Sequence, residues 1–454
     1  MAKKLKSINP YSGETIAEYP EMNSGTITKI LEQADETYKV IRKSSFEDRS
    51  VKMFKVAELL KENVEELAGL MTDEMGKVIS ESRAEVKKCA WVCEYYAENA
   101  EKFLSSRMIE TDAKKSYVKY EPIGTILAVM PWNFPFWQVF RFAAPTIMAG
   151  NTALLKHASN VQGCAEKIEE LFQKAGFEKG VFQNLAISSS KVAEIIENLI
   201  VKAVTLTGSE GAGIAVAETA GKQIKKSVLE LGGSNAFVVL ADCNLGNAID
   251  VALKARLQNG GQSCIAAKRF IIEEPVYNDF MEELRRRVEE YVVGDPKEED
   301  IDIGPLSSVS QAETVEEQVV ESKRQGAKII TGGKRDKAFF EPTILTGVKP
   351  GMAAFDEEIF GPVFAVSPPV KSPGEALELA NNSTFGLGIN VFTGSEKNAQ
   401  LFIENANEGA VFINAMVKSD PRLPFGGVKR SGYGRELSSE GIREFVNVKT
   451  VYVA

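Results

Sequence analysis

The sequence contains a single histidine, His157, in 454 residues. Ser-His-Asp hydrolysis and Cys-His proteolysis each require a histidine base, and zinc sites built from histidines need more than one. A single histidine therefore excludes zinc centres built from several histidines. Ser-His-Asp hydrolysis and Cys-His proteolysis stay possible only if His157 is the base. Any nucleophile must otherwise be activated by other means.

Cysteines and long apolar runs are also scarce. Five cysteines, an odd number without regular spacing, do not indicate a disulfide framework. No apolar run reaches the roughly 18 residues of a membrane helix, and the segment MAKKLKSINPYSGE lacks the apolar region of a signal peptide. We expect a cytoplasmic protein with no membrane partner. Cys89, Cys93, Cys164 and Cys243 are expected to be buried on helix faces.

Positive charge is in short supply too. The net charge is −9, whereas a nucleic-acid partner requires a basic face, so we expect no such partner. The arginine run at 285–287 lies among glutamates, which is typical of a solvated helix face with i,i+4 pairs. With 44% apolar and 26% charged residues, the chain is predicted to be globular, with two or three domains.

The hydrophobic pattern changes near residue 115. Before it, apolar residues at i, i+3 and i+4 predict helices in 24–41, 49–76 and 81–104, and Ser24 is a plausible N-cap of the first. After it, short apolar runs alternate with helix-length segments, which predicts parallel α/β sheets. The runs are GTILAVM, TALLK, GVFQNLAI, VKAVTLTG, KSVLEL, NAFVVL and RFIIEE.

The alternation occurs once before and once after the LELGG segment near residue 230. We therefore expect two α/β domains that meet there. The C-terminal segment NVKTVYVA predicts an alternating strand. Such a strand often completes a sheet in a partner subunit or a distant domain, so we expect an oligomer.

The stretch NGGQSCIAAKR places Cys264 after a glycine-rich loop. A thiol with an ordinary pKa of about 8.5 is only a few per cent thiolate at neutral pH, yet that thiolate is a strong nucleophile. Gly260 and Gly261 would let the backbone approach a bound ligand closely. Cys264 is therefore a candidate nucleophile, and the alternative is a loop cysteine without a role.

Two further segments carry candidate polar groups. Glu230 ends the apolar run of SVLELGGSN, where a carboxyl in apolar surroundings has a raised pKa and suits a base. The alternative for Glu230 is an ion pair with Lys225 or Lys226. Asn133 lies in MPWNFPFWQVFR, whose prolines and tryptophans predict a rigid turn that presents its amide as an oxyanion donor.

Two segments suggest a ligand with phosphates and a ribose. VTLTGSEGAGIAVAETAG predicts a strand, a glycine turn and a helix whose N-terminus could bind phosphate, although it is not a G-x-G-x-x-G fingerprint. Gly208 and Gly213 bracket this turn, and Ser209 offers a hydroxyl. In DEEIFGPV, the carboxylate of Glu357 or Glu358 could hold ribose hydroxyls, and Phe360 could stack on a ring.

The ordered motifs PWNFP, LLK, TGS, ELGG, GQSC, EEIFGPV and PFGGVKRSGYGRE resemble those of the aldehyde dehydrogenase superfamily, from INPYSGE to the C-terminus. The resemblance implies an α/β fold with two parallel, Rossmann-like domains and a small β oligomerisation element. Residues 1–105 and 123–231 would form the dinucleotide-binding domain, 232–430 the catalytic domain, and 106–122 with 431–454 the oligomerisation element. The oligomer would be a homodimer or a homotetramer.

The resemblance also assigns roles. Cys264 matches the nucleophile, Glu230 the general base, and Asn133 with the Cys264 backbone N–H the oxyanion hole. The implied reaction is thiolate attack on an aldehyde, hydride transfer to nicotinamide, and hydrolysis of a thioester, which needs no histidine and no metal. The implied cofactor site comprises Pro131, Trp132, Lys156, Ser159, Gly208, Ser209, Gly213, Leu231, Glu358 and Phe360.

The segment LLKHASN bears on the choice of cofactor. In this family, the position three residues after the lysine often carries Glu when NAD is used, because the carboxylate holds the 2′-hydroxyl. Ser159 stands there instead, beside Lys156, and would accept a 2′-phosphate. We therefore expect NADP to be preferred, with some use of NAD.

The substrate expectation depends on Arg141, which lies at a tunnel position where succinate-semialdehyde dehydrogenases have an arginine that clamps the far carboxylate. QNGGQSC and VKSDPRLPFGG also resemble a short bacterial subgroup of those enzymes. The second arginine of many members is replaced here by Gln258, so Ser419 or Arg422 would have to compensate. We expect oxidation of succinate semialdehyde.

Three alternatives stay open. The first is broad activity on neutral aliphatic aldehydes. The replacement of the second arginine by Gln258 favours it, and Arg141 disfavours it. The second is a non-catalytic structural or thiol-reactive binding protein, which an intact set of Cys264, Glu230 and Asn133 disfavours. The third is acyl transfer to coenzyme A, which Glu230 disfavours because acylating members generally lack that base.

Overall fold

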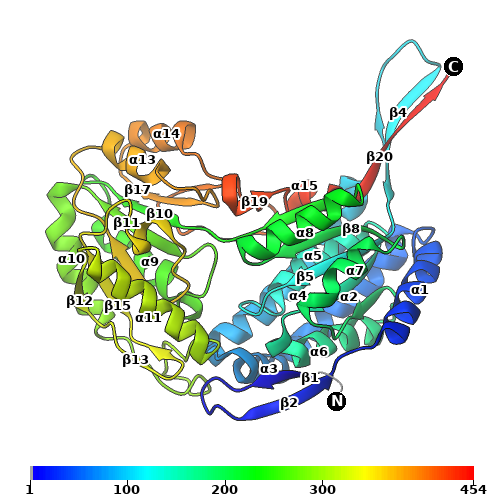
Figure 1. Ribbon diagram of the computed structural model, residues 1–454. Coiled ribbons are helices and arrows are strands. Elements are labelled where there is room, and N and C mark those ends of the chain that lie inside the picture. Colours follow the sequence, from blue (N-terminus) through cyan, green and yellow to red (C-terminus); the bar gives the residue numbers. More distant parts are fainter. Residues whose placement is uncertain (1–3) are drawn as a thin grey trace.

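The computed structural model describes residues 4–454. Two α/β units lie side by side, and an arm of strands projects from one of them (Figure 1). All seven apolar runs form strands, and the predicted fold class with parallel sheets is confirmed.

The first sheet has the order β19-β9-β8-β5-β6-β7. Its parallel strands are β5 (Thr125–Met130), β6 (Thr152–His157), β7 (Phe182–Asn184), β8 (Val201–Thr207) and β9 (Lys226–Glu230). The short β19 (Gly432–Tyr433) pairs antiparallel with β9 at the edge. If the parallel strands are numbered 1 to 5 along the chain, with β5 as strand 1, their order across the sheet is 3-2-1-4-5. This order is typical of dinucleotide-binding sheets.

Helices surround this sheet. They are α1 (Ser24–Ile41), α2 (Phe46–Glu62), α3 (Val64–Met75), α4 (Ile79–Phe103), α5 (Trp137–Met148), α6 (Gln162–Lys174), α7 (Val192–Glu197) and α8 (Glu210–Lys222), with the short turns η1 (Ser159–Val161) and η2 (Ser189–Lys191). Asn23 caps α1 by accepting from the Thr26 N–H at 2.9 Å, so the prediction of Ser24 as N-cap was wrong by one residue. The hairpin of β1 (Lys4–Ile8) and β2 (Thr15–Pro20) was not predicted.

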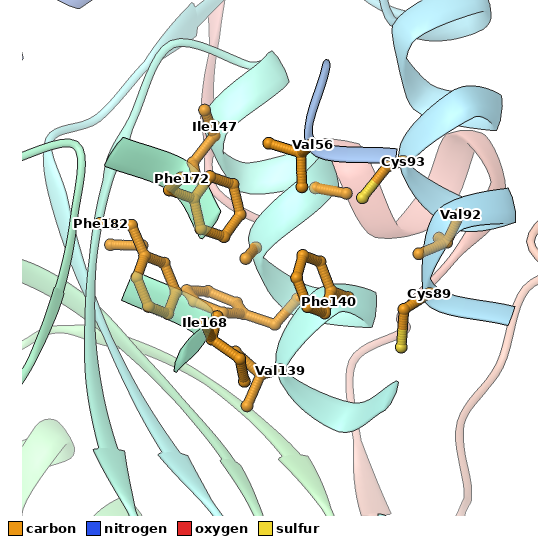
Figure 2. Packing of buried hydrophobic residues seen from close by; sticks show 14 of the residues in the cluster. Val56, Cys89, Val92, Cys93, Val139, Phe140, Ile147, Ile168, Phe172 and Phe182 are labelled. Carbon is orange, nitrogen blue, oxygen red and sulfur yellow. The ribbon is translucent and has the colours of Figure 1, made fainter. Parts of the chain in front are cut away.

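A buried aromatic cluster fixes α4, α5 and α6 relative to β7. Figure 2 shows Phe140, Phe172 and Phe182 packed in a row, with Cys89 and Cys93 of α4 beside them. The ring centroids of Phe140 and Phe172 are 5.6 Å apart, and those of Phe172 and Phe182 are 4.7 Å apart. Such packing makes this part of the core rigid, which matters because α4 and α5 also carry residues of the site.

The expectations for the other cysteines are met in part. Cys89, Cys93 and Cys164 are buried in helices as predicted. Cys243 is only partly buried and lies in the turn before α9, so its placement on a buried helix face was wrong.

The second sheet has the order β12-β15-β16-β11-β10-β17-β18. It consists of β10 (Asn235–Val239), β11 (Ala267–Ile272), β15 (Thr343–Thr346), β16 (Val363–Val366), β17 (Ile389–Phe392) and β18 (Val411–Ile413), which run parallel, and β12 (Lys328–Thr331), which is antiparallel. β10 begins five residues after β9 ends, at the LELGG segment where two α/β units were expected to meet.

The second unit carries its own helices. They are α9 (Leu245–Leu257), η3 (Gln258–Gly261), α10 (Glu274–Val288), α11 (Val309–Arg324), α12 (Ala353–Asp356), α13 (Pro373–Asn381) and α14 (Glu396–Asn405), with a hairpin of β13 (Arg335–Asp336) and β14 (Phe339–Phe340). The arginine run lies on α10, where Arg285, Arg286 and Arg287 pair with acidic residues on the exposed face, as predicted.

The arm consists of β3 (Arg107–Met108), β4 (Lys115–Pro122) and β20 (Val446–Val453), with the C-terminus at its tip (Figure 1). Between β18 and β20, η4 (Lys429–Ser431), β19 and α15 (Ser438–Arg443) return to the first unit, where β19 pairs with β9 and α15 contacts α4 and α5. Residues 432–443 thus lie with the first sheet and not with the arm. The domain boundaries otherwise stay a proposal, which the grouping of the strands supports. No helix within residues 4–454 has the length and apolar content to cross a membrane.

Asn151 fastens the base of the arm to the first sheet. Its buried Oδ1 accepts from the Ile123 and Gly124 N–H groups at 2.8 and 3.0 Å, and its Nδ2 donates to the Phe445 carbonyl at 2.8 Å. Asn151→Ala leaves these backbone groups without their partner, so the free energy of unfolding should fall by about 2–4 kcal/mol in denaturant unfolding. Asn405→Ala, at an exposed asparagine, should change it by less than about 0.5 kcal/mol. Equal midpoints for both variants would contradict this role.

Candidate active site

Two cavities meet at Cys264. The first, about 260 Å³, is lined by Pro131, Trp132, Asn133, Gln138, Thr207, Gly208, Ser209, Glu230, Leu231, Gly232, Cys264, Gln311, Glu358 and Phe360. The second, about 420 Å³, has Cys264, Gln138, Arg141, Gln258 and Ser419 among its lining residues. Ten residues expected in the site thus line the first cavity, and three more join Cys264 in the second. Lys156, Ser159 and Gly213 line neither.

The loop before Cys264 has an unusual backbone. Asn259, Gly260 and Gly261 have φ values of 56°, 59° and 76°, and only glycine adopts such values readily. A Cβ on Gly261 would lie 2.3 Å from the Gly361 carbonyl oxygen. Close approach was expected between this glycine pair and a ligand, but Gly261 instead accommodates the backbone of the segment that follows Phe360.

Cys264 is a partly exposed residue, yet the pKa of its thiol is raised to about 11. Desolvation is the main cause, and the positive charge of Arg141 opposes it, while Glu358 and Glu230 add to it. At neutral pH the thiol is therefore protonated, and a neighbouring base must remove its proton before it can attack.

Asn133 joins the turn of the first unit to the cysteine loop of the second. Its Nδ2 donates to the Gln262 carbonyl at 3.0 Å, and its Oδ1 accepts from Gln138 Nε2 at 3.1 Å. Asn259 Nδ2 in turn donates to the Asn133 carbonyl at 2.8 Å. One amide N–H of Asn133 remains for a ligand, and the Cys264 backbone N–H has no acceptor within residues 4–454. These two donors can serve one oxyanion.

Glu230 is buried at the end of β9, and neither carboxyl oxygen has a hydrogen-bond partner among the described residues. Desolvation raises its pKa well above the ordinary value, and the nearby Glu436 raises it further, while Arg141 opposes both. Lys225 donates to the Ile196 and Asn198 carbonyls and Lys226 pairs with Glu444, so neither neutralises Glu230. An unpaired buried carboxyl of this kind can act as a base.

Glu436 was not anticipated from the sequence. It is buried, forms an ion pair with Arg141 of α5, and influences the pKa of Glu230. It is the last residue of the motif PFGGVKRSGYGRE, but only the return of residues 432–443 to the first sheet brings it to the site. Arg141 thus balances two buried carboxyl groups, which no spacing in the sequence revealed.

The first cavity has the polar groups that a dinucleotide would need. Ser209 caps α8 by accepting from the Ala212 N–H at 3.4 Å. Because Gly208 and Ser209 both line the cavity, the N-terminus of this helix faces it. Glu358 pairs with Lys268 at 3.0 Å and accepts from the Gly233 N–H at 3.1 Å. Gly213 has a packing role, because its Cβ would lie 2.7 Å from Leu231.

The ring of Phe360 is held in place across the same cavity. It meets Trp132 edge to face, with centroids 5.7 Å apart, and Gln311 Nε2 donates to the Phe360 carbonyl at 2.9 Å. The roles of Gln311 and Lys268 were both missed in the sequence: Gln311 belongs to no motif, and nothing in the stretch NGGQSCIAAKR relates Lys268 to Glu358.

Lys156 and His157 end β6, directly before the turn η1 that contains Ser159. Lys156 is buried, burial lowers its pKa, and it has no carboxylate within 4 Å in the described chain. Ser159 is exposed beside it. His157 is structural: it accepts from the Ala158 N–H at 3.0 Å, its Nε2 lies 2.9 Å from the Pro135 carbonyl, and burial lowers its pKa to about 4.

The second cavity contains Arg141, whose guanidinium lies 4.6 Å from the Phe425 ring and 3.4 Å from Thr207 Oγ1. Gln258 lies at the end of α9, and Ser419 is buried. Arg422 was wrongly offered as a candidate, since Asp420 binds its guanidinium at 2.8 and 2.7 Å and it does not line the cavity. Lys88 of α4, which no motif indicated, does line it.

Comparisons with known proteins agree with this geometry. A sequence profile described as "Aldehyde dehydrogenase family" matches residues 1–451. A Synechocystis sp. protein named "Probable succinate-semialdehyde dehydrogenase" for NADP(+) is 48% identical over 453 residues, which cover 99% of this chain and 100% of that protein. A Mycobacterium tuberculosis protein, succinate-semialdehyde dehydrogenase 1 for NADP(+), is 45% identical over 456 residues, with 99% and 100% covered.

A solved structure is similar throughout. The succinic semialdehyde dehydrogenase from Streptococcus pyogenes in complex with NADP+ superimposes with a TM-score of 0.97 at 39% identity. The match covers 99% of each chain.

The environment of Cys264 predicts slow alkylation of the free protein. Because the thiolate reacts and the pKa is near 11, the iodoacetamide rate at Cys264 should rise about tenfold per pH unit from pH 7 to 9.5 without levelling off. Peptide mass spectrometry separates Cys264 from Cys243, the other cysteine that is not fully buried. A rate that levels off near pH 8.5 would show an ordinary thiol and contradict the desolvation argument.

Proposed function

The chain belongs to the aldehyde dehydrogenase family, and we propose that it oxidises succinate semialdehyde to succinate with NADP as the hydride acceptor. The observation that carries the proposal is the position of Cys264 at the junction of two cavities. One has the groups that a dinucleotide needs, and the other is lined by the buried Arg141 and the partly buried Lys88, whose positive charges suit a carboxylate. The NADP(+) succinate-semialdehyde dehydrogenases described above support the choice of both molecules.

The first step is attack of Cys264 on the aldehyde carbon. Glu230, as the unpaired carboxyl at the end of β9, takes up the thiol proton, directly or through water, and the sulfur forms a bond to the carbonyl carbon. The carbonyl oxygen becomes an oxyanion, which Asn133 Nδ2 and the Cys264 backbone N–H stabilise. Two donors of this kind contribute several kcal/mol to the transition state, with about 2.7–4 kcal/mol measured for one such donor elsewhere.

The second half of the reaction releases the acid. NADP, when bound, would supply the acceptor for the hydride of the tetrahedral carbon, and Cys264 would then hold the acyl group as a thioester. Glu230 first releases to solvent the proton that it took from the thiol, and it then removes a proton from water. The hydroxide adds to the thioester carbon, and the carbon–sulfur bond breaks to give the carboxylic acid and the thiolate. The proton of the acid passes to the thiolate, which leaves the carboxylate and the free thiol, and Glu230 returns its second proton to solvent. The charge of Arg141 limits the cost of ionising Glu230 beside Glu436.

The residues of β6 and α8 fit NADP. Lys156 is a buried cation without a carboxylate partner in the described chain, and Ser159 has no charge that would repel a 2′-phosphate. Gly208, Ser209 and the α8 N-terminus would hold the diphosphate, and Glu358 and Phe360 would hold the ribose and the nicotinamide ring. NAD remains usable, because none of these groups requires the 2′-phosphate.

We also propose a homodimer or homotetramer in the cytoplasm. The arm carries exposed apolar side chains at Met108, Val448, Tyr452 and Val453, and β18 leaves an edge of the second sheet unpaired within residues 4–454. Exposed strands of this kind favour pairing with another chain. The reaction requires Cys264 as a free thiol, and the cytoplasm keeps thiols reduced.

Initial rates of NADP reduction test the substrate. Succinate semialdehyde should give a kcat/KM at least about tenfold above that of pentanal, which corresponds to about 1.4 kcal/mol of discrimination. In Arg141→Met, this ratio should fall because the cavity loses a cation, while kcat should fall for both aldehydes because Glu230 loses its balancing charge. A wild-type protein that prefers pentanal would make it a dehydrogenase of neutral aldehydes and overturn the proposal.

Ser159→Glu tests the cofactor. A carboxylate at this position repels the 2′-phosphate, so kcat/KM with NADP should fall about 100-fold. It can also accept the 2′-hydroxyl of NAD, so kcat/KM with NAD should rise. Ser190→Glu, an exposed serine in the turn η2, is the matched control and should leave the NADP preference unchanged. Activity of the wild-type protein with NAD alone would contradict the assignment.

A further inference from the structure

We propose that Lys88 binds the far carboxylate of the semialdehyde and so supplies the cation that Gln258 does not. This inference rests on the proposed function and names the residue that gives it specificity. Lys88 belongs to no motif of the sequence and comes from a helix of the first unit, whereas Gln258 comes from the second.

Helix α4 forms one wall of the second cavity. Its residues Ser80, Glu81, Ala84, Glu85 and Lys88 line the cavity, and their spacing places them on one face of the helix. The cluster shown in Figure 2 packs a different face of α4, which contains Cys89 and Cys93, against α5. Lys88 is therefore presented by a rigid element and not by a loop.

The ammonium group of Lys88 is held by two contacts inside the cavity. Its Nζ donates to Ser419 Oγ at 2.8 Å and lies 4.1 Å from the Trp137 ring centroid. Cys264 and Arg141 line the same cavity. Ser419 was expected to touch the substrate, and the structure places it where it positions Lys88 as well.

Lys88 is partly buried, and it lacks the anion that a cation in such a position normally has. No carboxylate lies within 4 Å of its Nζ in residues 4–454. The two carboxylates that act on its charge already have other partners. Glu85 accepts from the Phe136 and Trp137 N–H groups at 3.0 and 2.9 Å and pairs with Lys77, and Asp420 is bound by Arg422. A desolvated ammonium without a counter-ion is costly, and a substrate carboxylate would offset that cost.

The other cations of the cavity are less suited to this role. Arg141 already forms an ion pair with Glu436, so much of its charge is compensated. Lys254 and Lys418 also line the cavity, but both are exposed, and solvent screens their attraction. Lys88 therefore contributes the uncompensated positive charge, and Arg141 can add hydrogen bonds to the same carboxylate.

The charge of Lys88 is sensitive to pH. The pKa of Lys88 is lowered to about 8, mainly by desolvation and in addition by Arg141 on α5. Cys89 and Glu85 on α4, and Asp420 in the loop that also contains Ser419, oppose this shift. Below pH 8 the side chain is charged and can bind a carboxylate, and above pH 8 it is neutral. The KM for succinate semialdehyde should rise as the pH increases through this value.

Lys88→Met, compared with Lys88→Arg, tests the inference. Methionine preserves most of the apolar volume but removes the charge, so KM for succinate semialdehyde should rise about 10- to 100-fold, with kcat changed much less. Pentanal should retain its KM, which also shows that the variant is folded. Lys88→Arg should restore most of the affinity, and Lys87→Met, at the exposed neighbouring lysine, should resemble the wild type.

The pH profile distinguishes binding from a structural role. In the wild type, KM for succinate semialdehyde should rise above pH 8 while KM for pentanal stays flat, and in Lys88→Arg the rise should disappear. If the wild type prefers succinate semialdehyde but Lys88→Met keeps this preference, the inference is overturned and the proposed function stands. If the wild type shows no preference, the proposed function fails first.

Discussion

The buried hydrogen bonds between the Asn133 turn and the cysteine loop hold the site together. Asn133 Nδ2 donates to the Gln262 carbonyl, and Asn259 Nδ2 donates back to the Asn133 carbonyl. The turn follows β5 of the first sheet, and the loop precedes β11 of the second. Because the bonds are reciprocal and buried, the two units cannot shift here without leaving polar groups unsatisfied. The same bonds orient the amide beside Cys264, so one constraint serves both the fold and the chemistry.

Charge is distributed unequally around Cys264. Glu230 lines the first cavity as an unpaired carboxyl, and Arg141, which pairs with Glu436, opposes the rise in the pKa of Glu230 and so keeps a base available in a desolvated place. In the second cavity, the wall formed by α4 contains an ammonium without a carboxylate partner within residues 4–454. The first arrangement suits proton transfer, and the second suits recognition of an anion. A protonated resting thiol fits the same scheme, because Cys264 needs to ionise only when the aldehyde is in place.

Local sequence patterns predicted the parts that depend on neighbouring residues. Period and length identified all seven runs as strands, and the motifs around Cys264, Glu230 and Asn133 named the residues that meet at the first cavity. They could not reveal the role of Glu436, although it ends the motif PFGGVKRSGYGRE, because only the antiparallel pairing of β19 with β9 brings residues 432–443 back to the first sheet. Lys88 escaped notice for a similar reason: on α4 it resembles any lysine of an amphipathic helix until the loop of Ser419 covers it. The prediction for Arg422 failed because Asp420, two residues away, already binds its guanidinium.

A crystal structure of Cys264→Ala with NADP and succinate semialdehyde would test the central claim most directly. The account predicts the nicotinamide in the cavity of Glu358 and Phe360, the aldehyde beside Asn133, and the carboxylate within hydrogen-bond distance of Lys88 Nζ and Arg141. Both molecules in one cavity, or a carboxylate that points to solvent away from α4, would contradict it.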